Sequence, residues 1–153
     1  MSLADSVGDV IKSLTRQLES LSWVADFGIR LWVAWVFWKS GQTKIANWDS
    51  TLFLFEDFYD VPLLPPELAA YLGTAVELSM PVLLVIGLAT RFGAVVLFVF
   101  NIVAVLSLPE LRAVDLQNHA LWGLLLLATL FHGPGKVSID HLIRQRFWGG
   151  ERR

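Results

Sequence analysis

The chain has 153 residues, of which 55% are hydrophobic, and its formal net charge is -2. With a mean hydropathy of +0.57, this composition excludes a disordered protein and argues against an ordinary soluble domain. The chain has no cysteine, which excludes disulfides, thiol redox chemistry and cysteine-ligated zinc or iron–sulfur centres within it. It carries no basic stripe with interleaved aromatic residues, so we expect no nucleic-acid partner.

The first expected element is an amphipathic helix close to the N-terminus. Apolar residues recur from Leu3 to Leu21 at three- and four-residue steps, and charged residues fill the other face. This pattern indicates a helix that lies on the membrane surface, with Trp23 at the interface. A helix that caps a partner subunit or frays in water is the alternative. Asp5 and Asp9 interrupt the stretch, so we expect no cleavable signal peptide.

Four long apolar segments follow, at about residues 27–46, 69–89, 91–108 and 117–133. Because about 20 apolar residues cover the hydrocarbon core of a bilayer, the expected fold is an all-α membrane protein. We predict a four-transmembrane-helix bundle that forms a single domain over residues 1–153. Gly133-Pro134-Gly135 should end the fourth span, and Ser138 should cap a short interfacial helix at the C-terminus.

The distribution of charge predicts the orientation. The segment 47–67 carries five acidic residues and no Lys or Arg. Its aromatic residues, from Trp48 to Tyr59, indicate a loop that dips into the headgroup region. Basic residues lie instead before the first span, at Arg91 and after the fourth span. The positive-inside rule then places both termini in the cytoplasm and the acidic loop outside.

One carboxylate, Glu77, lies in the middle of the second span, four residues before Pro81. An acid at this depth costs about 2.5–3.5 kcal/mol, so it requires a partner or a polar cavity, and Pro81 frees the carbonyl of Glu77. Counting ~1.5 Å per residue places Lys39 and Asn101 at the same depth. We therefore expect Lys39 to pair with Glu77, with Arg30 as the second choice. A pair that only fixes the helix register is the alternative.

Polar groups that face lipid are penalised, so the polar residues of the four spans should converge on the bundle axis. The residues expected to line a ligand site there are Trp35, Lys39, Lys44, Glu77, Asn101, Asn118, His119 and Trp122. Their depths run from the middle of the membrane to the outer face. We therefore predict a cavity that opens outward beneath the segment Trp48–Tyr59, with Arg30 and Arg91 as charges on the cytoplasmic side.

The histidines argue against a metal or haem centre. His119 and His132 are thirteen residues apart on one expected helix, a separation of ~20 Å along the axis, and His141 lies beyond the helix end. We therefore expect no metal site, and a bis-histidine haem is disfavoured. No Walker loop, dinucleotide fingerprint or serine nucleophile elbow occurs. No catalytic residue is therefore assigned, and it stays open whether the chain is an enzyme.

The segment from Pro65 through Glu77 and Pro81 to Arg91 resembles the DoxX family of small bacterial membrane proteins. The resemblance continues at Arg30 and at Gly41-Gln-Thr-Lys44, and it closes with Gly133-Pro-Gly-Lys-Val-Ser-Ile-Asp140, so that it covers about residues 27–143. It implies four transmembrane helices in the bacterial cytoplasmic (inner) membrane. The recurrent polar positions of the family fall on Arg30, Lys44, Glu77, Arg91 and Asp140, whereas Lys39, Asn101 and His119 match none.

The resemblance also implies links to quinone-coupled sulfur oxidation, to thiol-oxidative-stress complexes and to operons that make metal-handling peptides. We expect a membrane subunit that binds a quinone or a similar amphipathic ligand for a redox partner. Lys39 and His119 would donate hydrogen bonds to a carbonyl, Glu77 would relay a proton, and Trp35 and Trp122 would flank the ring. The alternatives are a non-enzymatic binding or transport module for a polar solute or a metal-handling peptide system, and a structural assembly factor. The expected partners are the lipid bilayer and either another protein or further copies of this chain.

Overall fold

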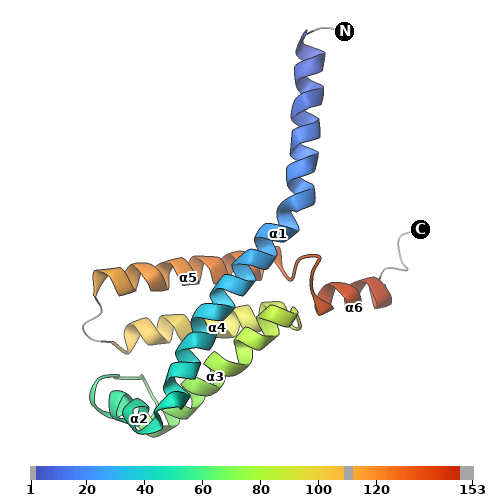
Figure 1. Cartoon of the computed structure of the whole chain (residues 1–153). Helices are drawn as coiled ribbons and strands as arrows, with labels where there is room; N and C mark the ends of the chain where they lie inside the picture. The colour runs from blue at the N-terminus through green and yellow to red at the C-terminus, as the bar shows by residue number, and fades with distance from the viewer. Residues whose placement is uncertain (1–2, 109–111, 149–153) are drawn as a thin grey trace.

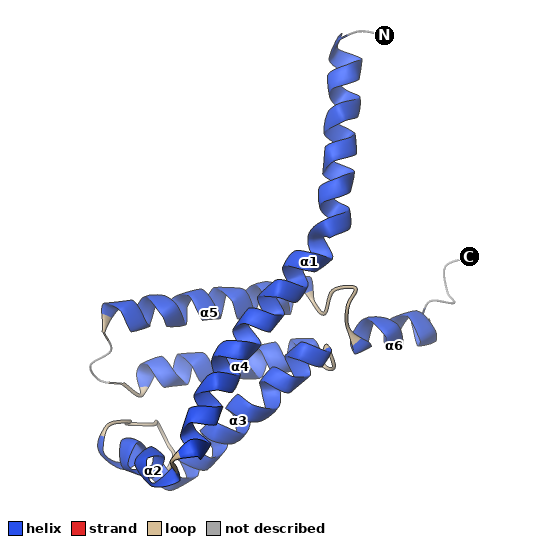
Figure 2. Ribbon diagram, in the orientation of Figure 1, coloured by secondary structure: helices blue, strands red, loops and turns tan. Residues whose placement is uncertain are grey.

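The computed structural model describes residues 3–108 and 112–148, and all regular structure in these ranges is α-helical (Figures 1 and 2). The helices are α1 (Leu3–Ala46), α2 (Trp48–Asp57), α3 (Pro66–Ile86), α4 (Thr90–Leu106), α5 (Ala113–His132) and α6 (Ile139–Trp148). The expectation of an all-α fold is therefore confirmed for the described residues.

Four helices form the body of the molecule through a closed ring of contacts. The C-terminal half of α1 contacts α3 and α5, α3 contacts α4, and α4 contacts α5 (Figure 1). At one end of this body α2 packs against α3 and α1, and we call it the α2 end. At the opposite end the backbone N–H of Asp140 in α6 donates to the carbonyl of Gly87 at 2.9 Å. We call this the α6 end.

The helices of the body approach one another closely because small residues lie at their crossings. The core is built from Val33, Ala34, Phe37, Leu84, Ala94, Leu97 and Leu126. A Cβ atom added to Gly41 would lie 2.8 Å from the Leu78 Cδ2 atom and 3.1 Å from the Glu77 Cβ atom. A side chain at position 41 would therefore force Leu78 to shift, and glycine lets α1 lie this close to α3 without it, a mode of packing typical of membrane helices.

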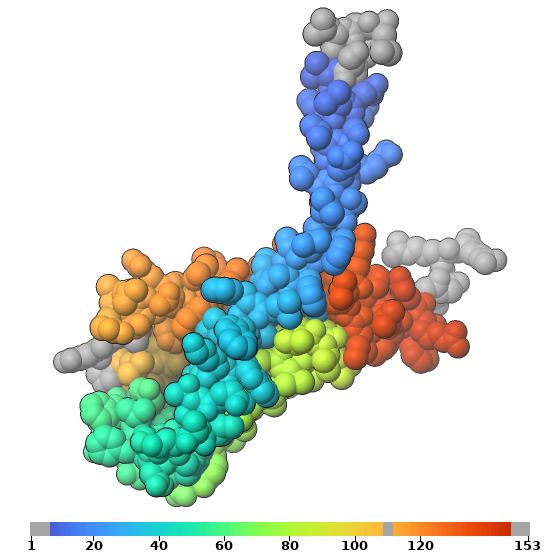
Figure 3. All heavy atoms as spheres, viewed as in Figure 1, coloured from blue at the N-terminus to red at the C-terminus, as the bar shows by residue number. Residues whose placement is uncertain are grey.

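The N-terminal amphipathic segment and the first apolar segment form one continuous helix of 44 residues. Its N-terminal half projects away from the body (Figure 3), and apolar residues such as Val7, Ile11 and Leu18 are exposed on it. The helicity of this half is confirmed, and its position on a membrane surface stays a prediction. The two predicted elements are joined because no proline separates them and a single glycine, Gly28, is tolerated within a helix.

The acidic segment contains a helix, α2, where we expected only a loop. The Oδ1 atom of Asn47 accepts a hydrogen bond from the backbone N–H of Ser50 at 3.1 Å and so caps α2. Phe55 is buried and packs against α3. An asparagine followed by an acid in the first turn, here Asp49, is a helix-start signal. The aromatic content of the segment led to the loop interpretation instead.

The predicted helix ends are confirmed where local chemistry decides them. Gly133 ends α5, and the Oγ atom of Ser138 accepts a backbone N–H in the first turn of α6 at 3.0 Å. Pro66 begins α3, ahead of the apolar segment expected from about residue 69, because proline is tolerated in the first turn of a helix. The turn between α3 and α4 ends at Ala89. Arg91 therefore lies in the first turn of α4.

Among the described helices, α3 is long and apolar enough, by length and composition, to cross a membrane, and α4 is apolar but has 17 residues. Polar residues interrupt the other two long helices, Lys39 and Lys44 in α1 and Asn118 and His119 in α5. Four membrane spans therefore stay a prediction.

Candidate functional site

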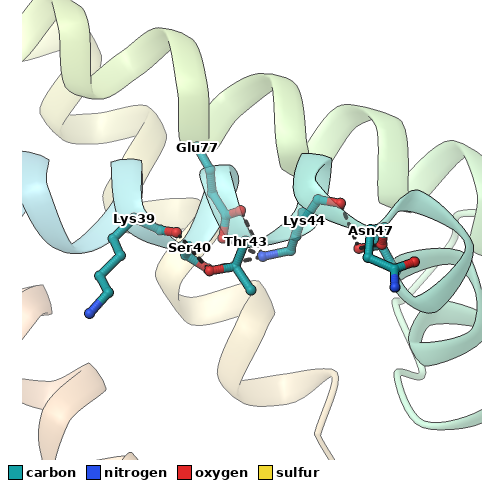
Figure 4. Close-up of polar contacts among 7 residues, drawn as sticks. Lys39, Ser40, Thr43, Lys44, Asn47 and Glu77 are labelled. Atoms are coloured by element: carbon teal, nitrogen blue, oxygen red, sulfur yellow. Dashed lines mark hydrogen bonds and ion pairs between the residues drawn. The ribbon is translucent and has the colours of Figure 1, made fainter.

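A buried ion pair joins α1 to α3 near the α2 end. The Lys44 Nζ atom lies 2.8 Å from Glu77 Oε1, 2.7 Å from Glu77 Oε2 and 3.0 Å from the Oγ atom of Ser40 (Figure 4). The side chains of Lys44 and Glu77 are only 18% and 5% exposed. An ammonium group has three protons to donate, so these three oxygens engage all of them.

The prediction that Lys39 pairs with Glu77 is wrong, and so is the second choice, Arg30. Lys39 is exposed and points away from Glu77 (Figure 4). The number of residues gives the depth of Lys39 along the axis of α1, but it does not give the direction in which the side chain points around that axis. Lys39 precedes Lys44 by five residues and is therefore turned about 140° around the helix from the Lys44 face. Arg30 lies at the other end of the body.

A cavity of about 330 Å³ lies beside the ion pair, between the helices of the body and the segment that follows α2. Its walls are mostly apolar, and its polar groups come from Ser40, Lys44, Tyr59, Glu77, Ser107 and His119. The backbone N–H of Asp60 donates to the carbonyl of Ser107 at 2.9 Å and so ties this segment to the end of α4. The cavity thus lies at the α2 end beneath the aromatic segment, as predicted. Its opening to the outside of the cell stays a prediction.

Hydrogen bonds to Asn101 determine which ring nitrogen of His119 carries the proton. The amide nitrogen of Asn101 donates to the carbonyl of His119 at 2.9 Å, so the amide oxygen is the acceptor. This oxygen lies 2.8 Å from the Nδ1 atom of His119, which must therefore carry the proton. In the neutral ring the Nε2 atom is then a hydrogen-bond acceptor. The Trp122 ring packs edge-on against the imidazole, with 4.8 Å between the centroids, and holds its orientation.

The structure brings together five of the residues predicted for the ligand site. Lys44, Glu77 and His119 line the cavity. Asn101 and Trp122 contact His119 but do not line the cavity. The predicted convergence therefore holds for this group.

The other three predicted residues lie elsewhere. Trp35 is 61% exposed, and Lys39 and Asn118 are exposed as well. Trp35 and Lys39 are four residues apart and so share one face of α1, but this face points outward. The opposite face of α1 carries Gly41 and Phe37 and packs in the body.

Three polar residues of the cavity were missed, namely Ser40, Tyr59 and Ser107. Ser40 precedes Lys44 by four residues and so shares its helical face, a spacing that could have identified it. Tyr59 was assigned to a loop in the lipid headgroups, yet it packs against the buried ring of Phe55, with 5.0 Å between the centroids. Burial raises the pKa of the Tyr59 phenol, and the negative charge of Glu77 adds to the shift. The phenol is therefore a protonated hydrogen-bond donor beside the cavity.

The charges predicted for the cytoplasmic side lie at the α6 end. Arg30 is buried and donates from Nη1 to the carbonyl of Leu84 at 3.3 Å and from Nη2 to the carbonyl of Val137. The carboxylate of Asp140 accepts two backbone N–H groups at the start of α4, at 2.8 and 2.9 Å. Arg91 is exposed at the same end. Arg30 and Asp140 thus join α1, α3, α4 and α6 at a distance from the cavity.

Within residues 3–108 and 112–148, no three His, Cys, Asp or Glu side chains gather closely enough to hold a metal ion. The Nδ1 atom of His132 instead lies 3.2 Å from a carboxylate oxygen of Asp26 at the α6 end. His132 therefore lies at the end of α5 that is remote from His119 and the cavity.

Comparison with known proteins identifies the family. The DoxX family model matches residues 25–109, which include Lys44, Glu77 and Asn101, whereas the closing motif from Gly133 to Asp140 lies beyond the matched range. A protein of Haemophilus influenzae described as uncharacterized is 29% identical over 126 residues, which cover 76% of this chain and 82% of the relative. No solved structure matches the chain significantly. Because the family model matches more than half of its residues, the chain belongs to the DoxX family of membrane proteins.

Proposed function

We propose that this protein is a membrane subunit in the bacterial cytoplasmic membrane that serves a redox partner. It binds a quinol- or quinone-type ligand in the cavity beside Lys44 and Glu77. The observation that carries the proposal is the chemical make-up of the cavity. It combines apolar walls with the Glu77 carboxylate and the imidazole of His119. Its volume of about 330 Å³ falls at the lower end of the range for small-molecule sites, which suits a single ring with polar substituents.

The distribution of side chains supports a body that is immersed in lipid as a bundle of four membrane-spanning helices. Large apolar residues are exposed on the outer faces of the helices, among them Trp32, Phe92, Leu124 and Phe131. The interior instead holds polar groups, including Arg30, Thr74, Glu77, Thr90, Asn101 and Thr129. In water, apolar patches of this kind would drive association. In lipid the exposed apolar side chains are solvated by acyl chains, and the polar groups make their contacts inside the bundle.

The hydrogen-bonding capacity of the cavity favours the reduced form of such a ligand. All three protons of Lys44 are already engaged, while Glu77 retains lone pairs and the Nε2 atom of His119 is an acceptor. A ring that bears hydroxyl groups would therefore find acceptors, with the Tyr59 phenol as a donor. This reverses the expectation from the sequence that His119 donates to a carbonyl. When bound, the ligand would supply two-electron redox chemistry, and the side chains of this chain would orient its hydroxyl groups.

Binding of the two redox forms of a short-chain ubiquinone tests the proposal. We expect purified protein in detergent, titrated calorimetrically without oxygen, to bind decylubiquinol more tightly than decylubiquinone. His119→Ala should weaken decylubiquinol binding by about tenfold, the effect of one hydrogen bond. His132→Ala is the matched control, because His132 lies on the same helix at the opposite end. Equal effects of the two variants, or no binding of either form, would refute the proposal.

The orientation can be tested because the chain contains no cysteine. A membrane-impermeant maleimide should label Asp57→Cys in intact cells but should label Lys136→Cys only after the cells are permeabilised. Both residues are exposed in the structure, so access from the aqueous phase alone decides labelling. Labelling of Lys136→Cys in intact cells would show that the C-terminal segment lies outside and would invert the proposed orientation.

A further inference from the structure

A second hollow, of about 290 Å³, lies at the α6 end, where α6 meets the start of α4. Two guanidinium groups line it, that of Arg91 in the first turn of α4 and that of Arg144 in α6. Phe92, Pro134 and Ile143 supply an apolar part of its wall. We call it the arginine hollow. It is separate from the cavity at the α2 end.

Positive charge dominates the arginine hollow. Neither Arg91 nor Arg144 lies within 4.0 Å of a carboxylate oxygen in the part of the chain that the structure describes. Arg91 makes one long contact, 3.5 Å from its Nη2 atom to the carbonyl of Phe131. The single acid in the lining, Asp140, already accepts backbone N–H groups with both of its oxygens. The two guanidinium groups are therefore available to an anion, and the positive end of the α4 dipole lies beside them.

From this arrangement we infer that the arginine hollow binds the phosphate group of an acidic phospholipid. Guanidinium groups suit phosphate because their planar forks donate two parallel hydrogen bonds. The exposed apolar surface beside the hollow identifies the source of the phosphate. Phe92 is 59% exposed at its edge, and Leu142 and Phe147 are exposed on α6. Acyl chains would cover these side chains, whereas a free phosphate ion would leave them in water.

This inference rests on the proposed immersion of the helices in lipid, but not on any ligand in the cavity beside Glu77. If the α6 end is at the cytoplasmic surface, the hollow meets the leaflet whose acidic headgroups attract basic side chains. Arg91 and Arg144 then hold one headgroup between two helices. The site would anchor α6, which is joined to α5 through Gly133, against the membrane.

The test is retention of lipid by the full chain in mild detergent, measured by native mass spectrometry with added phosphatidylglycerol or phosphatidylcholine. We expect phosphatidylglycerol to be retained in preference to phosphatidylcholine. Arg91→Gln and Arg144→Gln should each weaken this retention by about fivefold, the effect of one basic side chain on an acidic lipid surface. Arg146→Gln is the matched control, because Arg146 lies on α6, is exposed and does not line the hollow. Circular dichroism of each variant verifies that it folds.

Three results would overturn the inference. An equal loss with Arg146→Gln would show diffuse attraction rather than a site. Equal retention of both lipids would remove the preference for an acidic headgroup. Displacement of phosphatidylglycerol by millimolar inorganic phosphate would identify a site for the free ion. Flotation with vesicles tests the membrane proposal separately. If that proposal fails, the wild-type chain should float neither with phosphatidylglycerol vesicles nor with phosphatidylcholine vesicles.

Discussion

Lys44→Met is expected to destabilise the protein more than any other single change at the cavity, by about 3–5 kcal/mol, as when one partner of a buried ion pair is removed. It leaves the carboxylate of Glu77 unpaired at 5% exposure. Glu77→Gln should cost less, because the unpaired lysine is 18% exposed and can turn toward water. The measurement is the thermal unfolding midpoint of each purified variant in one detergent, followed by near-ultraviolet circular dichroism.

The double variant Lys44→Met/Glu77→Gln should recover part of this loss, since it leaves no uncompensated charge. Lys39→Met is the matched control on the same helix. Because Lys39 is exposed and belongs to no salt bridge within the described residues, its loss should leave the midpoint almost unchanged. Additive effects of the two single changes, or a loss with Lys39→Met as large as with Lys44→Met, would contradict the pairing in the structure.

Helix ends and buried polar character could be predicted because they depend on local chemistry. A proline pair begins α3 at Pro66 and glycine ends α5 at Gly133 whatever the rest of the fold does. An acid in an apolar helix requires a partner, and Glu77 has one. The kind of interaction was therefore predictable from composition and spacing.

The direction in which each face points could not be predicted in the same way. In a soluble protein the apolar face of a helix points inward. The C-terminal half of α1 is apolar around much of its surface, with Trp32 and Trp35 exposed and Val33 and Phe37 buried. Its period groups the residues correctly but does not say which group faces α3. The small residue Gly41, which lies against Leu78 and Glu77 of α3, was the signal that could have distinguished the faces.

Contacts between segments far apart in the chain also could not be predicted from the sequence. Arg30 donates to the carbonyl of Val137, 107 residues later in the chain, and Asn101 orients His119 across two helices. Neither pair follows from helical spacing, because each depends on how the helices pack. The tautomer of His119, and with it the preference proposed for a hydroxylated ligand, could only be inferred from the structure.

Gly87→Ala, at the α6 end, should also destabilise the protein strongly. Gly87 ends α3 with a φ of 69°, and a left-handed conformation costs an alanine about 1–2 kcal/mol. The new Cβ atom would also lie 2.7 Å from the Nη1 atom of Arg30 and 2.7 Å from the Cα atom of Ser138. Relieving such overpacking costs about 1–3 kcal/mol more.

The clash is directed at the contacts that close this end of the body. Arg30 would have to leave the carbonyls of Leu84 and Val137, or the segment at Ser138 would have to move and draw Asp140 away from the start of α4. Gly28→Ala is the matched control, because nothing lies within 4 Å of the Cβ atom that it would add. Within a helix, alanine is more stable than glycine by about 0.5–1 kcal/mol. The unfolding midpoint should therefore fall for Gly87→Ala and rise slightly for Gly28→Ala. A variant Gly87→Ala that unfolds at the wild-type temperature would show that Gly87, Arg30 and Ser138 are not packed together as the structure has them.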